Sequence, residues 1–160
     1  MKNKKAKMIG YGSFMKDVLE QMAQGLSPTT WGESVTLLGP VTISGFHRLW
    51  PGEFYPIVIP SETKSFLGLL LEVSETQIPR FDQIEGVPDL YERKSIEVKW
   101  QDSQTTAFLY VAGLKLQNMI FKSYLRQSRK PGFDDWLDHL RQTLSAAAKA
   151  ILPEIFNQDQ

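Results

Sequence analysis

FDQIEGVPDLYER, residues 81–93, places one of its carboxylates, Glu85, where apolar residues give way to a glycine. Gly86 allows a sharp turn just past the acid, and a Tyr-x-Arg sequence from Tyr91 to Arg93 follows. Because apolar surroundings disfavour a charged carboxylate, we expect the pKa of Glu85 to rise toward neutrality. A group of that pKa can accept and return a proton, as general acid/base catalysis requires. Glu85 is therefore the candidate catalytic residue.

The residues just before this stretch predict a broken helix. Ser74 and Gln77 have the spacing of a capping box, which favours a helix start at Ser74. Pro79 removes a backbone donor inside that helix. We therefore expect the helix to restart at Pro79 and to end near Glu85.

Toward the N-terminus the pattern changes between strand and helix. Residues 6–10 predict a first strand that opens into the turn Tyr11-Gly12-Ser13-Phe14, and residues 15–22 have helical spacing, with Gly25 as the stop. Further strands are expected at residues 34–50 (two short strands or one kinked strand), 55–60 and 66–73, with a turn at Pro51-Gly52.

Toward the C-terminus, residues 95–101 and 105–111 predict an antiparallel hairpin that turns at Asp102-Ser103. Helical sequence follows Gly113. Pro131-Gly132 then separates it from a long helix that begins at Asp134 and ends at Pro153.

About six short strands, mostly antiparallel, with a few helices indicate the α+β class. Short strands at close spacing tend to curl, since a closed barrel removes exposed sheet edges. The predicted fold is a small mixed β-barrel of about six strands with flanking helices. The length of 160 residues suits a single domain over residues 1–160.

Composition excludes several classes of function. Eighteen Lys and Arg balance eighteen Asp and Glu, so we expect no nucleic-acid partner. No apolar run approaches the ~20 residues of a membrane span, which predicts a cytoplasmic protein without a membrane partner. The chain lacks Cys, and His47 and His139 have no ligand spacing, so neither a thiol nucleophile nor a metal site is predicted.

Two glycine-containing turns are candidates for binding. The turn at Tyr11-Gly12-Ser13-Phe14 can present consecutive backbone N–H groups to an anion, although the sequence alone also fits an ordinary β-turn. The second is Glu85-Gly86. Four further short motifs accompany these turns. In chain order they are Tyr55-Pro56 before a strand, Gly68 at the start of an apolar strand, Tyr91-x-Arg93, and Tyr110 within a strand.

In that order these motifs resemble the γ-glutamylcyclotransferase-like family, which includes AIG2-like proteins and γ-glutamylamine cyclotransferases. The resemblance covers about residues 8–112, with a helical addition over about 116–153, and FDQIEG matches the family pattern LD-x-x-EG. It implies a barrel with the active site at one mouth. The implied reaction is attack of an α-amine on its own γ-carbonyl, which forms 5-oxoproline and releases an amine without metal or cofactor.

The resemblance also implies site roles. Glu85 acts as general base and acid, the backbone of residues 11–14 binds the α-carboxylate of a small γ-glutamyl substrate, and Tyr110 contacts that substrate. Tyr91 is assigned to substrate binding too, with barrel capping as the alternative. Where family members have Y-G-S-N or Y-G-T-L, this chain has Phe14, which favours an apolar leaving group.

Two other functions stay open at this point. One is a binding module that keeps the fold without turnover. The other is an enzyme that removes a γ-glutamyl protecting group from a biosynthetic intermediate. A monomer and a homodimer are both compatible with the sequence.

Overall fold

The structure is a computed structural model that describes residues 4–50, 56–126 and 136–156. Its strands are β1 (Lys5–Gly10), β2 (Thr29–Thr30), β3 (Glu33–Ser34), β4 (Thr36–Leu49), β5 (Ile57–Ser74), β6 (Tyr91–Trp100) and β7 (Ser103–Ala112). Its helices are α1 (Ser13–Ala23), the 3-10 turn η1 (Glu75–Gln77), α2 (Ile78–Glu85), α3 (Leu114–Arg126), α4 (Trp136–Thr143), α5 (Ala146–Ile151) and α6 (Pro153–Phe156). The α+β class is confirmed. Within the described part of the chain, no helix has the length and apolar character needed to cross a bilayer.

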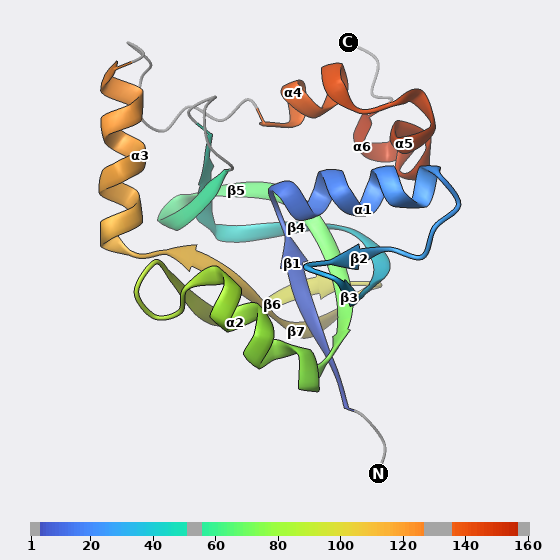
Figure 1. The fold of residues 1–160 in the computed structure, drawn as a ribbon, viewed down its shortest axis with the longest axis horizontal. Coiled ribbons are helices and arrows are strands. Elements are labelled where there is room, and N and C mark those ends of the chain that lie inside the picture. Colours follow the sequence, from blue (N-terminus) through green and yellow to red (C-terminus); the bar gives the residue numbers. More distant parts are fainter. Residues whose placement is uncertain (1–3, 51–55, 127–135, 157–160) are drawn as a thin grey trace.

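Five strands form one mixed sheet in the order β4-β5-β1-β7-β6 (Figure 1). β1 lies at its centre, antiparallel to β5 and parallel to β7, where Met8 lies opposite Phe108. β2 and β3 form a separate two-stranded hairpin. The central position of β1 brings its C-terminal end close to residues far along the chain.

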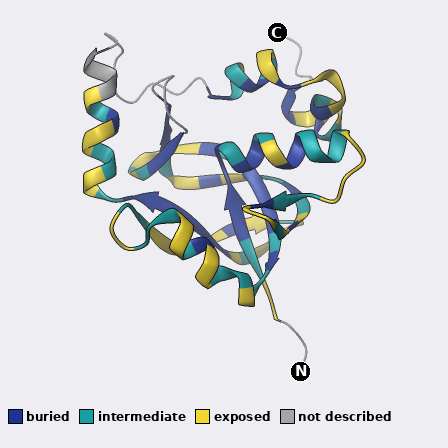
Figure 2. Ribbon diagram, viewed as in Figure 1, coloured by how far each residue is buried: buried dark blue, intermediate teal, exposed yellow. Residues whose placement is uncertain are grey.

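Both faces of the sheet are apolar. Successive side chains of a strand point to opposite faces, so Met8 joins the core beneath α1 while Ile9 joins the cluster inside the curl of the sheet. Helices α1 and α4–α6 lie over the first face, and α2 adds Phe81 to it (Figure 1). The C-terminal parts of β1 and β7 are buried, over residues 8–10 and 107–112, whereas β6 and the described part of α3 are mostly exposed or intermediate (Figure 2).

The predicted barrel does not close. Its two ends, β4 and β6, approach each other but share no hydrogen-bonded pairing among the described strands. The indole ring of Trp100 occupies the space beside Gly39 that a Cβ atom would fill. Trp100, Leu38 and Ile96 pack into the inner cluster, so side chains rather than a backbone ladder fill the gap.

Strand lengths also differ from the prediction. The strands expected at 55–60 and 66–73 are one strand, β5, as far as the described residues show. The register shifts between Ser44 and Phe46, and the Ser61 hydroxyl accepts hydrogen bonds from the Thr63 and Lys64 amides there. This polar irregularity bends the strand without ending it. The kinked strand expected at 34–50 is confirmed as β4.

The β6–β7 hairpin is confirmed, but its turn lies one residue earlier than predicted. Gln101 and Asp102 have φ values of 51° and 66°, and Trp100 pairs with Ser103. Positive φ at both central residues matches the right-handed twist of the flanking strands. Asp102 therefore belongs to the turn, and Ser103 begins β7.

The predicted long C-terminal helix is wrong, because the chain forms three short helices there. The Ser145 side chain accepts a hydrogen bond from the Ala148 amide and starts α5 as its N-cap. Ser145 also donates from its amide and hydroxyl to Glu20 of α1, which fixes the break. Pro153 begins α6 rather than ending a helix. The predictions at Pro51-Gly52, Tyr55, Pro131-Gly132 and Asp134 lie outside the described residues.

Candidate active site

Glu85 is the last residue of α2. The predicted capping box is present: the Ser74 amide donates to the Gln77 side chain over 2.8 Å, and the Ser74 hydroxyl accepts from the Thr76 amide over 3.4 Å. Pro79 lies in the first turn of α2, where its missing donor costs little. Gly86 follows with φ 72°, a left-handed conformation that suits glycine. These local signals end the helix at Glu85, as predicted.

Burial raises the pKa of Glu85 to about 7, while a hydrogen bond from the Trp31 side chain acts in the opposite direction. The expected rise toward neutrality is therefore confirmed. A carboxyl group of that pKa is present in both its charged and its neutral form at neutral pH.

The end of β1 and the start of α1 form a second part of the site. The helix begins at Ser13, so Ser13 and Phe14 belong to its first turn and not to the four-residue turn predicted from the sequence. Gly12 lies against Pro56, where a Cβ atom would approach the ring to 3.2 Å. The first amides of a helix have no intrahelical acceptor, and they carry the positive end of its dipole. The site therefore offers backbone donors suited to an anion.

Three tyrosines form a third part. The Tyr11 hydroxyl donates to the backbone carbonyl of Tyr110 over 2.5 Å, and the Tyr110 hydroxyl donates to Asp82 Oδ1 over 2.9 Å. Arg93 Nε lies 3.5 Å from the same Asp82 oxygen. Burial is the largest cause that raises the pKa of Tyr11, Tyr91 and Tyr110. The three phenols therefore stay protonated at neutral pH and act as neutral hydrogen-bonding groups.

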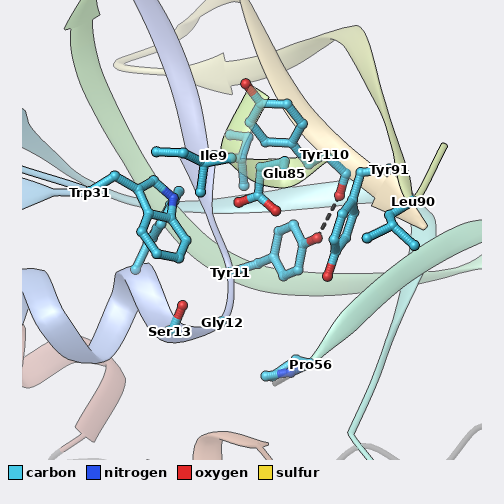
Figure 3. A pocket seen from close by; sticks show the side chains of 12 residues that line it. Ile9, Tyr11, Gly12, Ser13, Trp31, Pro56, Glu85, Leu90, Tyr91 and Tyr110 are labelled. Carbon is cyan, nitrogen blue, oxygen red and sulfur yellow. Dashed lines mark hydrogen bonds between the residues drawn. The ribbon is translucent and has the colours of Figure 1, made fainter. Parts of the chain in front are cut away.

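An aromatic wall completes the site. The ring of Phe14 packs edge to face against that of Trp31 at a centroid distance of 5.8 Å. Trp31 lies in the turn between β2 and β3, far from the other site residues in sequence. Figure 3 shows Trp31 and Tyr91 on opposite sides of Glu85.

These parts enclose one cavity of about 220 Å³. Its lining includes all seven residues that the sequence predicted, namely Glu85, Tyr11, Gly12, Ser13, Phe14, Tyr91 and Tyr110. It also includes Ile84 and Leu90, which belong to the apolar residues expected around Glu85, and three residues that the sequence analysis did not assign to the site: Ile9, Trp31 and Pro56. Trp31-Gly32 has the glycine of a two-residue hairpin turn but not the Asn or Asp that usually precedes it, so no clear sequence signal marks this turn or its place beside Glu85.

Arg48 was also missed. Its side chain is only 2% exposed, and its Nη1 donates to the carbonyls of Tyr11, over 3.1 Å, and Leu67, over 2.9 Å. The guanidinium lies 5.1 Å from the centre of the Phe66 ring. Arg48 thereby fixes the backbone at the end of β1, behind the cavity. No sequence pattern around residue 48 marks this role.

Within the described ranges, no group of three or more His, Cys, Asp or Glu side chains is placed to hold a metal ion. The arrangement instead offers one carboxyl group of near-neutral pKa, a helix N-terminus and three neutral phenols in one small cavity. It suits binding of a small anionic molecule and transfer of a proton within it.

Comparisons with known proteins agree with the fold and with the resemblance. Solved structures that match include an AIG2-like protein from Mus musculus, with 20% identity, a TM-score of 0.51, and coverage of 68% of this chain and 78% of that chain. A γ-glutamyl cyclotransferase matches with 11% identity, a TM-score of 0.53, and coverage of 94% and 99%. An uncharacterized protein from Homo sapiens matches with 12% identity, a TM-score of 0.52, and coverage of 92% and 97%.

At these identities the structural matches show the fold alone. A search of curated proteins found no match. The family model described as γ-glutamyl cyclotransferase, AIG2-like, however, matches residues 8–136, which is most of the chain. The protein therefore belongs to the γ-glutamyl cyclotransferase, AIG2-like family.

Proposed function

We propose that the protein cyclises the γ-glutamyl group of a small amide to 5-oxoproline and releases the amine, with Glu85 as general base and then general acid. The observation that carries the proposal is the position of Glu85, whose pKa is about 7, in the same cavity as the N-terminus of α1. The family supports the reaction class.

The α-carboxylate of the substrate binds at the start of α1 in this proposal. The backbone N–H groups of Gly12, Ser13 and Phe14 donate to it, and the helix dipole favours its negative charge. A charge-assisted hydrogen bond of this kind is stronger than a neutral one. Among the described lining residues none is a Lys, Arg or His, so backbone donors are the positive partners that the lining provides.

The reaction then moves two protons in turn through Glu85, from the attacking nitrogen to the leaving nitrogen. The carboxylate takes a proton from the α-ammonium group, and the free amine attacks the γ-carbonyl carbon to form a new C–N bond. Glu85 returns this proton to the nitrogen of the original amide, whose C–N bond breaks. The ring nitrogen then loses its second proton through the regenerated Glu85 carboxylate to the departing amine, so neutral lactam forms and the amine leaves as an ammonium ion. Because the attack is intramolecular, holding the glutamyl chain in a folded geometry supplies much of the rate. Tyr91 and Tyr110 contact the substrate along its buried side.

A panel of γ-glutamyl amino acids and γ-glutamylamines, scored for 5-oxoproline, tests this function. We expect release from at least one member, with one equivalent of amine per 5-oxoproline. Formation of glutamate in place of 5-oxoproline would indicate hydrolysis. Calorimetric binding of panel members without turnover would instead favour a binding module.

A protecting-group enzyme is the second candidate within the same chemistry. It shares the Glu85 step and differs only in the amine that leaves. The panel separates the two when a γ-glutamyl derivative of a larger intermediate is included, because that compound alone would then be turned over rapidly.

A further inference from the structure

Trp31 has an unusual backbone conformation for its residue type. It forms a two-residue turn with Gly32 between β2 and β3, and the φ values of the two residues are 52° and 78°. Turns of this kind favour Asn-Gly, because Asn tolerates a left-handed conformation and a bulky residue does not. An outlier of this kind that lines a cavity suggests a functional constraint on the side chain.

The hairpin that carries Trp31 is tied to the element that carries Glu85. Arg80 of α2 donates from Nε and Nη2 to the Trp31 carbonyl over 3.4 and 3.3 Å, and its Nε lies 3.3 Å from Glu33. Gln77 Nε2 donates to the Ser34 carbonyl over 3.0 Å. The position of the indole relative to Glu85 is therefore set by several contacts.

The other end of the hairpin is tied to α1. The Gln21 side chain accepts from the Thr29 amide over 2.6 Å and donates to the Thr29 carbonyl over 3.1 Å. The Trp31 ring then packs edge to face on Phe14, in the first turn of the same helix. The wall made by Trp31 and Phe14 is thus fixed from both sides of the cavity.

Exposure shows which end of the cavity opens to solvent. Trp31 is 43% exposed and Ile84 is 39% exposed, whereas Tyr110 and Tyr11 are 3% and 9% exposed. The deep end therefore lies at the tyrosines, and Trp31 lies across Glu85 from Tyr91 (Figure 3). If the γ-carbonyl of a glutamyl group lies at Glu85 with the glutamyl chain toward the tyrosines, its leaving amine faces Trp31 and Ile84.

The chemistry of this open end favours an apolar amine. Its described walls are aromatic and aliphatic, and Glu85 is the only acidic side chain among the described lining residues. A leaving group that carried a carboxylate would approach Glu85 without a cationic side chain from those residues beside it. An alkyl or aryl group, in contrast, buries apolar surface against the two rings.

We propose that Trp31 is the specificity-determining residue of the site and selects γ-glutamyl amides whose leaving amine is alkyl or aryl and uncharged beyond the amide nitrogen. The inference rests on the proposed function, since it assigns the half of the substrate that departs.

The test compares kcat/KM for γ-glutamylbenzylamide and γ-glutamylglycine, scored by 5-oxoproline. The proteins are the wild type, Trp31→Asn, Trp31→Ala and a matched control, Leu26→Ala. Leu26 is 55% exposed and is not among the residues that line the cavity. We expect the wild type to prefer the benzylamide, and the preference to fall about 10–200-fold in both Trp31 variants. The control should keep the wild-type ratio.

Thermal unfolding adds an independent readout. Both Trp31 variants lose the ring, but Asn suits a positive φ better than Ala does. We therefore expect Trp31→Asn to melt at a higher temperature than Trp31→Ala. Equal unfolding midpoints in the two variants, or a higher midpoint for Trp31→Ala, would show that the backbone is not strained at residue 31. The unusual φ value would then no longer support a functional role for Trp31.

The outcomes separate the inference from the proposed function. An unchanged substrate ratio in folded Trp31 variants, or a wild-type preference for γ-glutamylglycine, overturns the inference and leaves the cyclisation standing. If the wild type releases no 5-oxoproline from either compound, the proposed function fails. Calorimetric binding of the intact benzylamide then tests whether Trp31 contacts the leaving group. Equal affinity in the wild type and in Trp31→Asn would overturn the role proposed for Trp31.

Discussion

The two sides of the cavity are built in different ways. Glu85 lies on a helix and Tyr91 and Tyr110 lie on sheet strands. Tyr11 directly follows β1, and its hydroxyl donates a long-range hydrogen bond to the Tyr110 carbonyl. Trp31 lies in a two-residue turn and reaches the cavity from a separate small hairpin. Regular elements thus hold the residues proposed for proton transfer, while a short turn supplies the wall proposed for selecting the amine. The comparison predicts that changes at Glu85 alter the rate for every substrate, whereas changes at Trp31, which also hydrogen-bonds Glu85, alter the preference between substrates as well.

Glu85→Gln should give the largest effect. The amide keeps the shape of the side chain but cannot take a proton, and general acid/base catalysis contributes about 10²–10⁴-fold. We expect a loss of that size in 5-oxoproline release for every substrate, with the ratio between substrates unchanged. Glu92→Gln, an exposed carboxylate on β6, is the control and should retain activity. Near wild-type release by Glu85→Gln would refute the catalytic assignment.

Phe14→Asn should change preference more than rate. It replaces the ring that packs on Trp31 with a polar side chain, so γ-glutamyl amino acids with polar side chains should gain relative to γ-glutamyl alkylamines. Pocket changes of this size are worth about 1–3 kcal/mol, or ~10–200-fold in relative kcat/KM. Phe14→Leu keeps an apolar wall and should keep the wild-type ratio. If the kcat/KM ratio between the two kinds of substrate is the same in both variants, the Phe14 side chain packs in the core and does not contact the leaving group.

The raised pKa of Glu85 also has a consequence for stability. Between its ordinary value of 4.5 and about 7, the folded protein binds a proton that the unfolded chain does not. This stabilises the wild type at low pH, and the contribution is lost as the pH rises through 7. Because Glu85 is only half-buried, we expect an effect of about 1 kcal/mol, or a midpoint change of about 2–4 °C.

Glu85→Gln lacks this titration, so its stability relative to the wild type should rise between pH 5 and pH 8. Paired thermal melts of the two proteins at both pH values measure it. A difference that stays constant with pH, or that falls, would show that Glu85 titrates near its ordinary value.

Removal of divalent metal should have the smallest effect, because the proposed chemistry uses Glu85 and backbone donors only. Activity should survive prolonged treatment with EDTA on both the alkylamine and the amino-acid substrate. Loss with EDTA and recovery with a divalent ion would contradict the proton-transfer scheme on the Glu85 side of the cavity.

Local sequence signals predicted the helix that carries Glu85 well. The signals that bound this helix act between residues close in sequence: the capping box at Ser74, Pro79 in the first turn and Gly86 at the end. The helix and its terminal carboxylate therefore follow from the sequence. The motif series placed the tyrosines in the same site through a family resemblance. The elements themselves predicted an α+β protein, as observed.

The remaining features depend on contacts between distant residues. Trp31 reaches Glu85 only because the hairpin is tied to α2, and Arg48 meets the Tyr11 carbonyl only in the folded sheet. Whether the barrel closes depends on how Trp100 packs beside Gly39, which no local pattern reveals. Residue periodicity describes one element at a time, so it does not predict contacts between residues that are distant in sequence.

The central place of β1 has a consequence for synthesis of the chain. Met8 finds its partner Phe108 only about a hundred residues later, and at about 5–20 residues per second β1 waits about 5–20 s for β7. β5 pairs along one edge of β1 before β7 is made, so only the other edge of this apolar strand stays open, and an open strand edge is a template for aggregation. Lys4 directly precedes β1, and Lys5 and Lys7 lie within it, so their like charges repel other nascent chains. We therefore expect these lysines to protect the open edge of β1 until β7 pairs with it.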